Sequence, residues 1–205
     1  MRKFTKVASL ALAAVLTAVG FAGCGAGSST DGGSASGDKQ VIKIGGIGPL
    51  TGAAAIYGQA VKNGAQIAVD EINAKGGLQF ELKFEDDEND AEKAVNAYNN
   101  LKDWGMQVSM GTVTTTPCIA VSNDINSDGI FGLTPSASAP DVVKDKEYMF
   151  QMCFTDPNQG VASAKYIKEQ NLGQKIAVIY NNSDVYSTGI YQKFDSEAKA
   201  QGLDI

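Results

Sequence analysis

The sequence predicts an α/β protein built on a parallel β-sheet that is flanked by helices. The first observation is that short apolar runs of strand length alternate with longer segments whose apolar residues recur at helical spacing. The second is that several of these runs are continuously apolar, which is typical of parallel strands covered on both faces. The hydrophobic fraction of 43% is sufficient for the core of one large domain or two small ones.

The first four elements follow a polar stretch. We expect a strand over residues 41–48, a helix over residues 56–75, a strand over residues 79–84 and a helix over residues 91–104. The glycine pair after the first helix is a typical helix end. The residues expected on the buried face of the first helix are Ala60, Val61, Ala65, Ala68 and Ile72.

A glycine-rich turn follows the first predicted strand and invites comparison with dinucleotide-binding loops. Gly46, Gly48 and Gly52 have the spacing G-x-G-x-x-x-G, which differs from the dinucleotide motif, and Pro49 interrupts it. We therefore expect no nucleotide and no other cofactor at this turn.

An acidic run follows the second predicted strand. Residues 85–90 have neither the central glycine nor the terminal glutamate of a calcium-binding EF-hand loop. We expect a solvated loop in which Asn89 and Glu92 form a capping box for the next helix.

Two hydroxyl-rich clusters lie in the middle of the chain. Each follows a short apolar run, residues 108–110 and residues 130–133, that we expect to be a buried parallel strand. A helix over residues 117–128 connects them, so both clusters fall at the carboxyl ends of neighbouring strands, where open sheets bind ligands. Such a place suits a carboxylate, although Ser and Thr are also common in loops without any ligand. The clusters are Thr112, Thr114, Thr115 and Thr116, and Thr134, Ser136 and Ser138.

Four further elements are expected towards the end of the chain. They are a strand over residues 148–154, a helix that Thr155 or Asp156 caps, a strand over residues 175–180 and a helix over residues 190–201. The chain then ends on the start of another strand, so we expect it to be an N-terminal fragment.

Several classes of function are disfavoured by composition. The chain has no His, which excludes Ser/His and Cys/His nucleophilic machinery and most zinc sites. It has no P-loop and no G-x-S-x-G motif, so we expect neither an enzyme nor a metal site. The formal net charge of −6 argues against nucleic acid as a partner. Cys118 and Cys153 are compatible with a disulfide and equally with two free thiols.

The N-terminus is typical of an export signal. Residues 1–23 combine a basic start with a short apolar segment and end in small residues before Cys24. This junction resembles the lipobox of bacterial lipoproteins, in which the Cys is lipidated; the alternative is an ordinary cleaved signal with an incidental Cys. Residues 24–39 form a Gly/Ser-rich tether, which an anchored domain needs. We expect the protein on the outer face of the bacterial cytoplasmic membrane, which is periplasmic in a Gram-negative cell.

Six segments together resemble the branched-chain amino-acid-binding proteins of bacterial ABC importers, the leucine/isoleucine/valine-binding type of periplasmic-binding fold. This resemblance implies a type I fold of two α/β lobes with the ligand between them. Residues 40–150 would be the N-terminal lobe, and residues 151–205 the start of a second, truncated lobe. The segments are residues 41–58, 68–77, 111–120, 134–140, 154–160 and 175–186.

The resemblance also implies a set of ligand-binding residues. Backbone N–H groups and the hydroxyls of Thr115 and Ser138 would hold the α-carboxylate, and the Ser138 oxygen would accept from the ammonium. Tyr57 and Tyr186 would supply aromatic side chains, one from each lobe. The acidic residue that pairs with the ammonium in this family would lie beyond residue 205. Within the chain, Asp156 is a candidate for this acidic group; the alternative is that Asp156 only caps its helix. The complete set is Tyr57, Val113, Thr114, Thr115, Ser136, Ala137, Ser138, Asp156 and Tyr186.

The function implied by the resemblance is that of an extracytoplasmic substrate-binding protein. It would be anchored to the membrane by lipid at Cys24, would bind an amino acid, and would deliver it to the permease subunits of an ABC importer. The alternative is the ligand-binding ectodomain of a sensory receptor with the same fold.

Overall fold

The computed structural model describes residues 40–205. The predicted signal peptide at residues 1–23, the lipidation site Cys24 and the tether at residues 24–39 lie outside the described residues. In the described part of the chain, no helix has the length and apolar character needed to cross a membrane.

A five-stranded sheet in the order β2-β1-β3-β4-β5 forms the centre of the fold, and every neighbouring pair of strands is parallel. This confirms the predicted fold class. The strand predicted over residues 148–154 is shorter than expected, because only its central residues pair with β4. The strands are β1 Val41–Gly48, β2 Gln79–Asp86, β3 Val108–Thr112, β4 Phe131–Thr134 and β5 Met149–Gln151.

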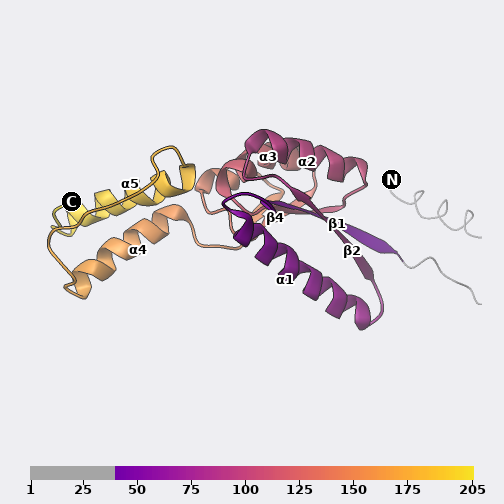
Figure 1. The fold of residues 1–205 in the computed structure, drawn as a ribbon, viewed down its shortest axis with the longest axis horizontal. Coiled ribbons are helices and arrows are strands. Elements are labelled where there is room, and N and C mark those ends of the chain that lie inside the picture. Colours follow the sequence, from indigo (N-terminus) through magenta and orange to yellow (C-terminus); the bar gives the residue numbers. More distant parts are fainter. Residues whose placement is uncertain (1–39) are drawn as a thin grey trace, which may run out of the picture. The chain divides into compact units, whose positions relative to one another are not determined.

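Helices cover both faces of the sheet. Figure 1 shows α1 on one face, and α2 and α3 side by side on the other. The parallel pairs β1–β2 and β3–β4 therefore have the helical crossovers that parallel strands require, through α1 and α3. The helices are α1 Ala55–Ala74, α2 Ala91–Asp103, α3 Thr115–Ser127, the short 3₁₀ helix η1 Pro140–Val142, α4 Asp156–Glu169 and α5 Val185–Ala200.

The main core lies between the sheet and the pair α2 and α3. Its largest fully buried side chains include Tyr98 and Leu101 of α2, Val121 and Ile125 of α3, and Ile47 of β1. Apolar residues three and four positions apart on each helix supply this face, as the helical spacing predicted. The buried core holds β1, β3 and β4 in register, so the ends of these three strands meet at one edge.

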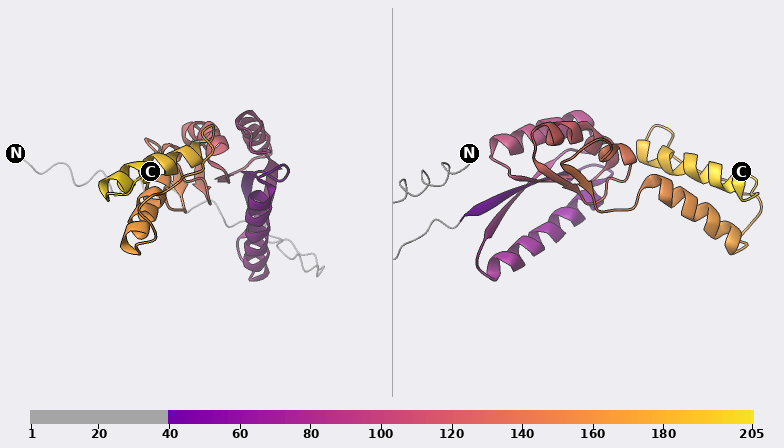
Figure 2. Two further views of the ribbon diagram at one scale, coloured as in Figure 1. Left: turned by 60° about the vertical axis from the view of Figure 1, so that its left-hand side comes forward. Right: turned by 180° about the vertical axis from the view of Figure 1, so that it is seen from behind.

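A second, smaller core lies between α4 and α5, which Figure 2 shows side by side in both views. Ala164, Phe194, Ala198 and Leu203 form it. Gly160 permits the close approach of the two helices, because a Cβ there would lie 2.4 Å from the Ile190 carbonyl oxygen.

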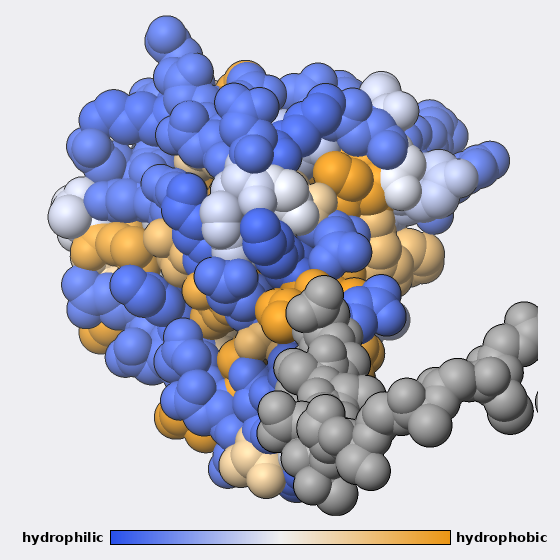
Figure 3. All heavy atoms as spheres, turned by 90° about the vertical axis from the view of Figure 1, so that its right-hand side faces the viewer, coloured by the Kyte–Doolittle hydropathy of each residue, from blue (hydrophilic) through white to orange (hydrophobic). Residues whose placement is uncertain are grey.

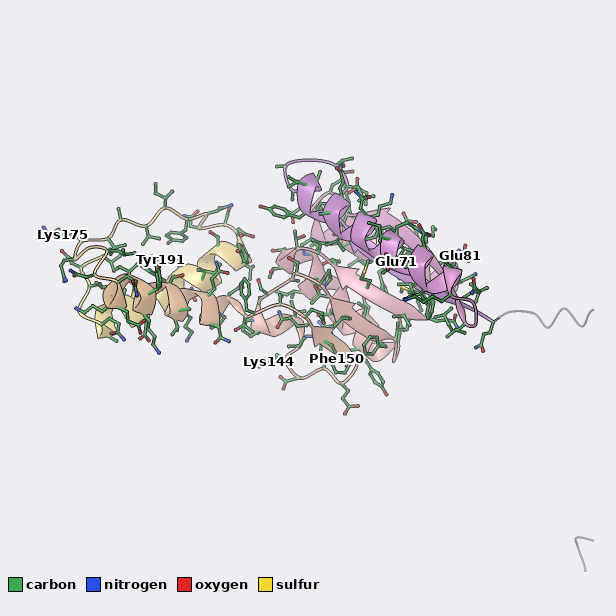
Figure 4. The ribbon with its side chains drawn as sticks, turned by 90° about the horizontal axis from the view of Figure 1, so that it is seen from below. Glu71, Glu81, Lys144, Phe150, Lys175 and Tyr191 are labelled. Atoms are coloured by element: carbon green, nitrogen blue, oxygen red, sulfur yellow. The ribbon has the colours of Figure 1, made fainter. Side chains whose placement is uncertain are left out.

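The strands predicted over residues 175–180 and at the end of the chain do not form among the described residues. A single parallel bridge between Lys175 and Asp204 is all that joins them. A strand needs a ladder of backbone hydrogen bonds, and no further strand lies beside these segments within residues 40–205. Tyr180 instead stacks on Tyr191 of α5, with 4.0 Å between ring centroids; Figure 4 labels Tyr191 and Lys175.

The starts of α2 and α5 differ from the prediction. Asp90, rather than Asn89, caps α2: its carboxylate accepts from the backbone N–H of Lys93 at 2.9 Å. Asp184 caps α5 by accepting from the Ser187 N–H at 2.9 Å, so that helix begins five residues earlier than expected. As a result, Tyr186 lies in the first turn of α5 and not in a loop.

The buried face of α1 is rotated from the predicted one. Gly58 and Val69 are its buried residues, and the predicted Val61 and Ala65 are half-buried beside them, whereas Ala60 and Ala68 are exposed and Ile72 is 44% exposed. The reason is a close contact at the start of the helix, where a Cβ on Gly58 would lie 2.0 Å from the Pro49 carbonyl oxygen. This contact sets the rotation of the whole helix against the sheet.

Part of the apolar surface is not covered by any element of residues 40–205. Phe131 and Phe150 lie on β4 and β5 at 46% and 47% exposure and stack with ring centroids 5.1 Å apart. Figure 4 labels Phe150 at this edge of the sheet, and Figure 3 shows separate hydrophobic patches within the mostly hydrophilic surface of another face.

Candidate ligand-binding site

A cavity of about 480 Å³ lies at the carboxyl ends of β1, β3 and β4, within the unit Asp38–Ile205. This is the edge at which open parallel sheets bind ligands, and the volume is in the usual range for small-molecule sites. Both hydroxyl-rich segments reach it, as predicted. The predicted residues that line it are Tyr57, Val113, Thr114, Thr115, Ser136, Ser138 and Tyr186.

Two hydroxyls of the clusters have structural roles and do not line the cavity. Thr134 Oγ1 donates to the Thr112 carbonyl oxygen at 2.7 Å and accepts from the Ala137 N–H at 3.0 Å. Thr112 Oγ1 donates to the Thr114 carbonyl oxygen at 3.0 Å. The first of these bonds joins the ends of β3 and β4, and the other two each fix one of the loops that face the cavity.

The N-terminus of α3 points donors towards the cavity. Thr114 is the N-cap residue, but its side chain makes no capping hydrogen bond, and Thr114 Oγ1 is buried with no partner among the described residues. The N–H groups of the first helical turn have no partner within a helix, and the helix dipole favours negative charge there. Thr115 and Thr116 follow in that turn and also line the cavity. This end of the cavity therefore suits an anion.

Ser138 is fixed by bonds on two sides. Its N–H donates to Thr115 Oγ1 at 3.3 Å, and its hydroxyl donates to Asp156 Oδ1 at 2.6 Å. The Asp156 N–H in turn donates to the Ser138 carbonyl oxygen at 3.1 Å. These bonds link the loop after β4 to both α3 and α4.

Two of the predicted site residues lie behind the cavity wall. Asp156 is 1% exposed and contacts Ser138 instead of the cavity. Burial raises the pKa of Asp156, and the Ser138 hydrogen bond opposes that shift. Ala137 is also buried, and its carbonyl oxygen accepts from Gln151 Nε2 and from the Cys153 thiol.

Aromatic side chains line the cavity from three elements. Tyr57 lies on α1, Tyr186 on α5 and Phe154 in the segment between β5 and α4. They are 62%, 41% and 63% exposed, so each has a free face towards solvent or a ligand. Together with Ala54 and Val113 they make this part of the cavity apolar.

Sequence reasoning missed several residues that line the cavity, among them Asn89, Cys153 and Asp184. Asn89 has a left-handed backbone, φ 62°, which Asn tolerates better than most residues. Asp184 reaches the cavity as the cap of α5, a position that the late predicted helix start concealed. The signal for Asp184 is present in the sequence, because Asp is a preferred N-cap residue and a helical spacing follows it.

Both described cysteines are free thiols. Burial raises the pKa of Cys118 to about 11, and burial also raises the pKa of Cys153. Neither thiol is therefore an activated thiolate near neutral pH.

Asp87 is a buried carboxylate beneath the turn that places Asn89. It is fully buried; Oδ1 accepts from the Asn89 N–H at 2.8 Å, and Oδ2 has no partner among residues 40–205. Burial raises the pKa of Asp87 to about 6, and repulsion from Asp86 and Asp90 adds to the shift. The turn is therefore held by a carboxylate whose charged form is unfavourable.

Replacing Asp87 by Asn is expected to raise the free energy of unfolding at pH 7 by about 1–3 kcal/mol. The folded-state pKa of about 6 lies above the unfolded value of about 3.9, so the folded state binds this proton more tightly. The resulting stabilisation is complete below about pH 4 and is lost as the pH rises through 6.

Urea unfolding of wild type and Asp87→Asn at pH 4.5 and pH 7.5 tests this. The gap between the two proteins should be larger at pH 7.5, while Asp103→Asn, an exposed change on α2, should leave the pH dependence as in wild type. A gap that is the same at both pH values would contradict the burial of an ionised Asp87.

Comparisons with known proteins agree with this geometry. Residues 41–205 match the periplasmic binding protein family. The chain is 37% identical over 166 residues to the Leu/Ile/Val-binding protein BraC3 of Rhizobium johnstonii, covering 79% of this chain and 45% of the relative. It is 34% identical over 175 residues to the Leu/Ile/Val-binding protein homolog 3 of Brucella melitensis, covering 83% and 47%. The chain thus spans about half the length of the curated relatives it matches.

Solved structures show the same fold. The branched-chain amino acid transporter substrate binding protein LivJ of Streptococcus pneumoniae, solved in complex with isoleucine, has a TM-score of 0.75 at 30% identity, covering 78% of this chain and 47% of that one. The leucine binding protein LivK of Thermotoga maritima has a TM-score of 0.74 at 25% identity, covering 80% and 47%. With a family match over most of its length and these relatives, the chain belongs to the periplasmic binding proteins.

Proposed function

We propose that this chain is part of an extracytoplasmic substrate-binding protein that delivers a branched-chain amino acid to an ABC importer. The observation that supports this most is the composition of the cavity wall. Hydroxyl groups from two loops, the donors of the α3 N-terminus and three aromatic side chains all face one space. The names of the relatives, which include Leu/Ile/Val-binding proteins, support the same class of ligand.

An amino acid is a zwitterion, so its site needs donors for one end and acceptors for the other. The carboxylate would be held at the α3 N-terminus by the Thr115 hydroxyl and by backbone N–H groups of the segment that follows Val113. These residues line the cavity, and the unpartnered hydroxyl of Thr114 lies beside them. Hydrogen bonds to a charged group contribute roughly twice as much as neutral ones, so a few of them suffice to orient the ligand.

The ammonium end would lie towards Ser138 and the acidic groups near it. Ser138 lines the cavity, and Asp156 is bonded to it from behind. Asp184 lines the cavity from the start of α5 and contributes a second carboxylate. These carboxylates favour the positive end of a zwitterion over a second negative group on this side of the cavity.

The ligand side chain would contact the apolar part of the wall. Tyr57, Phe154 and Tyr186 surround it, with Ala54 and Val113 between them. Burying a Leu, Ile or Val side chain stabilises a complex by roughly 1.5–3 kcal/mol relative to leaving it exposed. The free faces of the aromatic side chains leave room for such a contact.

Calorimetric titration of the full-length protein with leucine, isoleucine and valine tests this function. We expect saturable binding of at least one of them, with arginine and glutamate as controls that do not bind. A folded protein that gives no heat with any of the three would rule out the branched-chain class.

The proposal includes a lipid anchor at Cys24, which rests on the sequence around it. Replacing Cys24 by Ser is expected to move the protein from the membrane fraction to the soluble fraction, because the thiol is the point of lipid attachment. Fractionation of cells followed by immunoblotting measures this, with Cys153→Ser as the matched control that stays in the membrane fraction. Membrane attachment of the Cys24→Ser protein equal to that of wild type would show a different anchor.

A further inference from the structure

The bond between Ser138 and Asp156 determines what the Ser138 hydroxyl offers to a ligand. A hydroxyl has a single proton to donate, and the Ser138 proton is donated to Asp156 Oδ1 at 2.6 Å. The remaining lone pairs of Ser138 Oγ only accept. Because donating to a carboxylate polarises the hydroxyl, its oxygen also becomes a better acceptor.

Thr115 has the opposite arrangement. Its Oγ1 accepts from the Ser138 N–H at 3.3 Å. Within residues 40–205, the Thr115 hydroxyl donates to no acceptor. The proton of Thr115 is thus free for an anion, whereas the proton of Ser138 is not. These two hydroxyls of the cavity wall therefore differ in what they offer a ligand: Thr115 can donate, whereas Ser138 can only accept.

Asp156 is held so that it has few alternatives to this bond. It is 1% exposed and Ser138 is 2% exposed, so water does not compete for the bond. Its N–H donates to the Ser138 carbonyl oxygen, which fixes the first turn of α4 against the loop. On the other side its carboxylate faces Gly189 of α5, where an added Cβ would lie 3.3 Å from Asp156 Oδ2. That second oxygen has no partner among the described residues.

We propose that Asp156 is a positioning residue that makes the site select α-amino acids over carboxylic acids that lack the amino group. By accepting the Ser138 proton, it leaves Ser138 able to accept from an ammonium and unable to donate to a carboxylate. This departs from the resemblance, which also implies that the Ser138 hydroxyl holds the α-carboxylate. Asp156 acts through Ser138 and does not contact the ligand. This inference rests on the proposed function, because it assigns the ammonium end to Ser138.

The test compares two ligands that differ only in the amino group, leucine and 4-methylpentanoate, by calorimetric titration of the full-length protein. In wild type, leucine is expected to bind at least 10-fold more tightly. Asp156→Ala removes the acceptor, so the Ser138 proton becomes free to donate to a carboxylate. The affinity ratio of the two ligands is then expected to fall about 10-fold or more.

Asp156→Asn distinguishes positioning from a direct effect of the charge. An Asn at this position keeps an oxygen that accepts the Ser138 proton. The affinity ratio of leucine to 4-methylpentanoate in Asp156→Asn should therefore stay within about 3-fold of wild type. Thr115→Val should weaken both ligands by a similar factor, since both have the carboxylate. Asp103→Ala, an exposed change on α2, should alter neither affinity. Circular dichroism and thermal unfolding establish that each variant is folded.

Three outcomes would overturn the inference. An unchanged ratio in Asp156→Ala would show that the bond to Ser138 has no part in selection. A ratio that falls as far in Asp156→Asn as in Asp156→Ala would assign selection to the negative charge and not to the hydroxyl. Wild type that binds leucine without discriminating against 4-methylpentanoate would overturn this inference alone, whereas wild type that binds neither would overturn the proposed function with it.

Discussion

Replacing Ser138 by Ala is expected to weaken leucine binding by about 10- to 100-fold, the effect of losing a hydrogen bond to a charged group. Ser138 lines the cavity, and its hydroxyl is the one that Asp156 orients. Alanine removes the acceptor for the ligand ammonium. It also leaves Asp156 Oδ1 without its donor in a buried place, so the loop after β4 loses one of its two links to α4.

Titration calorimetry with leucine measures this loss, and Ser127→Ala is the matched control. Ser127 is exposed at the end of α3, away from the residues that line the cavity, so its removal should leave the affinity unchanged. Equal affinities for the two variants would remove Ser138 from the binding site. Thermal unfolding of both variants separates a loss of binding from a loss of folding.

Replacing Gly160 by Val is expected to lower the free energy of unfolding by about 1–3 kcal/mol, since overpacking a close contact typically costs this much. Gly160 lies on α4 where α5 passes close to it. A Cβ would lie 2.4 Å from the Ile190 carbonyl oxygen and 2.7 Å from the Phe194 backbone nitrogen. Both are backbone atoms, so no side chain can rotate away, and the two helices must separate and open their small core.

Urea unfolding measures this effect, and Gly64→Ala is the control with the opposite sign. Gly64 lies within α1, where an added Cβ would meet nothing within 4 Å. Alanine there should stabilise the protein by about 0.5–1 kcal/mol, because it restricts the unfolded chain and favours the helix. Equal effects of the two substitutions would show that α4 and α5 do not approach each other as closely as the structure describes.

Local patterns in the sequence were enough to predict the sheet and most of the helices around it. The first strand, residues 41–48, was predicted with both of its ends correct. Polar residues before this apolar run and a Gly-Pro turn after it determine where the strand begins and ends. The two strands that precede the hydroxyl clusters, and the helix between them, were also predicted. Their parallel pairing placed both clusters at one edge, which is why five predicted site residues from these two segments line the cavity.

Tertiary structure decided which hydroxyl has which role. Thr112 and Thr134 belong to the same clusters as Thr115 and Ser138, but they do not reach the cavity. The Thr134 hydroxyl bonds from β4 to β3, and the Thr112 hydroxyl bonds within the loop after β3. The bond from Ser138 to Asp156 joins residues 18 positions apart, and the bond from Ser138 to Thr115 joins residues 23 positions apart. No local pattern encodes such partners, because they depend on how the elements pack.

The same reason explains the wrong predictions. The apolar run over residues 175–180 has the composition of a strand, but only one bridge forms there among the described residues. A strand forms only where a neighbouring strand supplies partners for its backbone hydrogen bonds. The buried face of α1 was rotated because the contact between Gly58 and Pro49 sets the helix against the sheet. The sequence by itself determined where strands, helices and hydroxyl clusters occur, through local periodicity and turn chemistry. Tertiary structure alone decided their partners, because hydrogen bonds and packing between distant residues form only once the chain has folded.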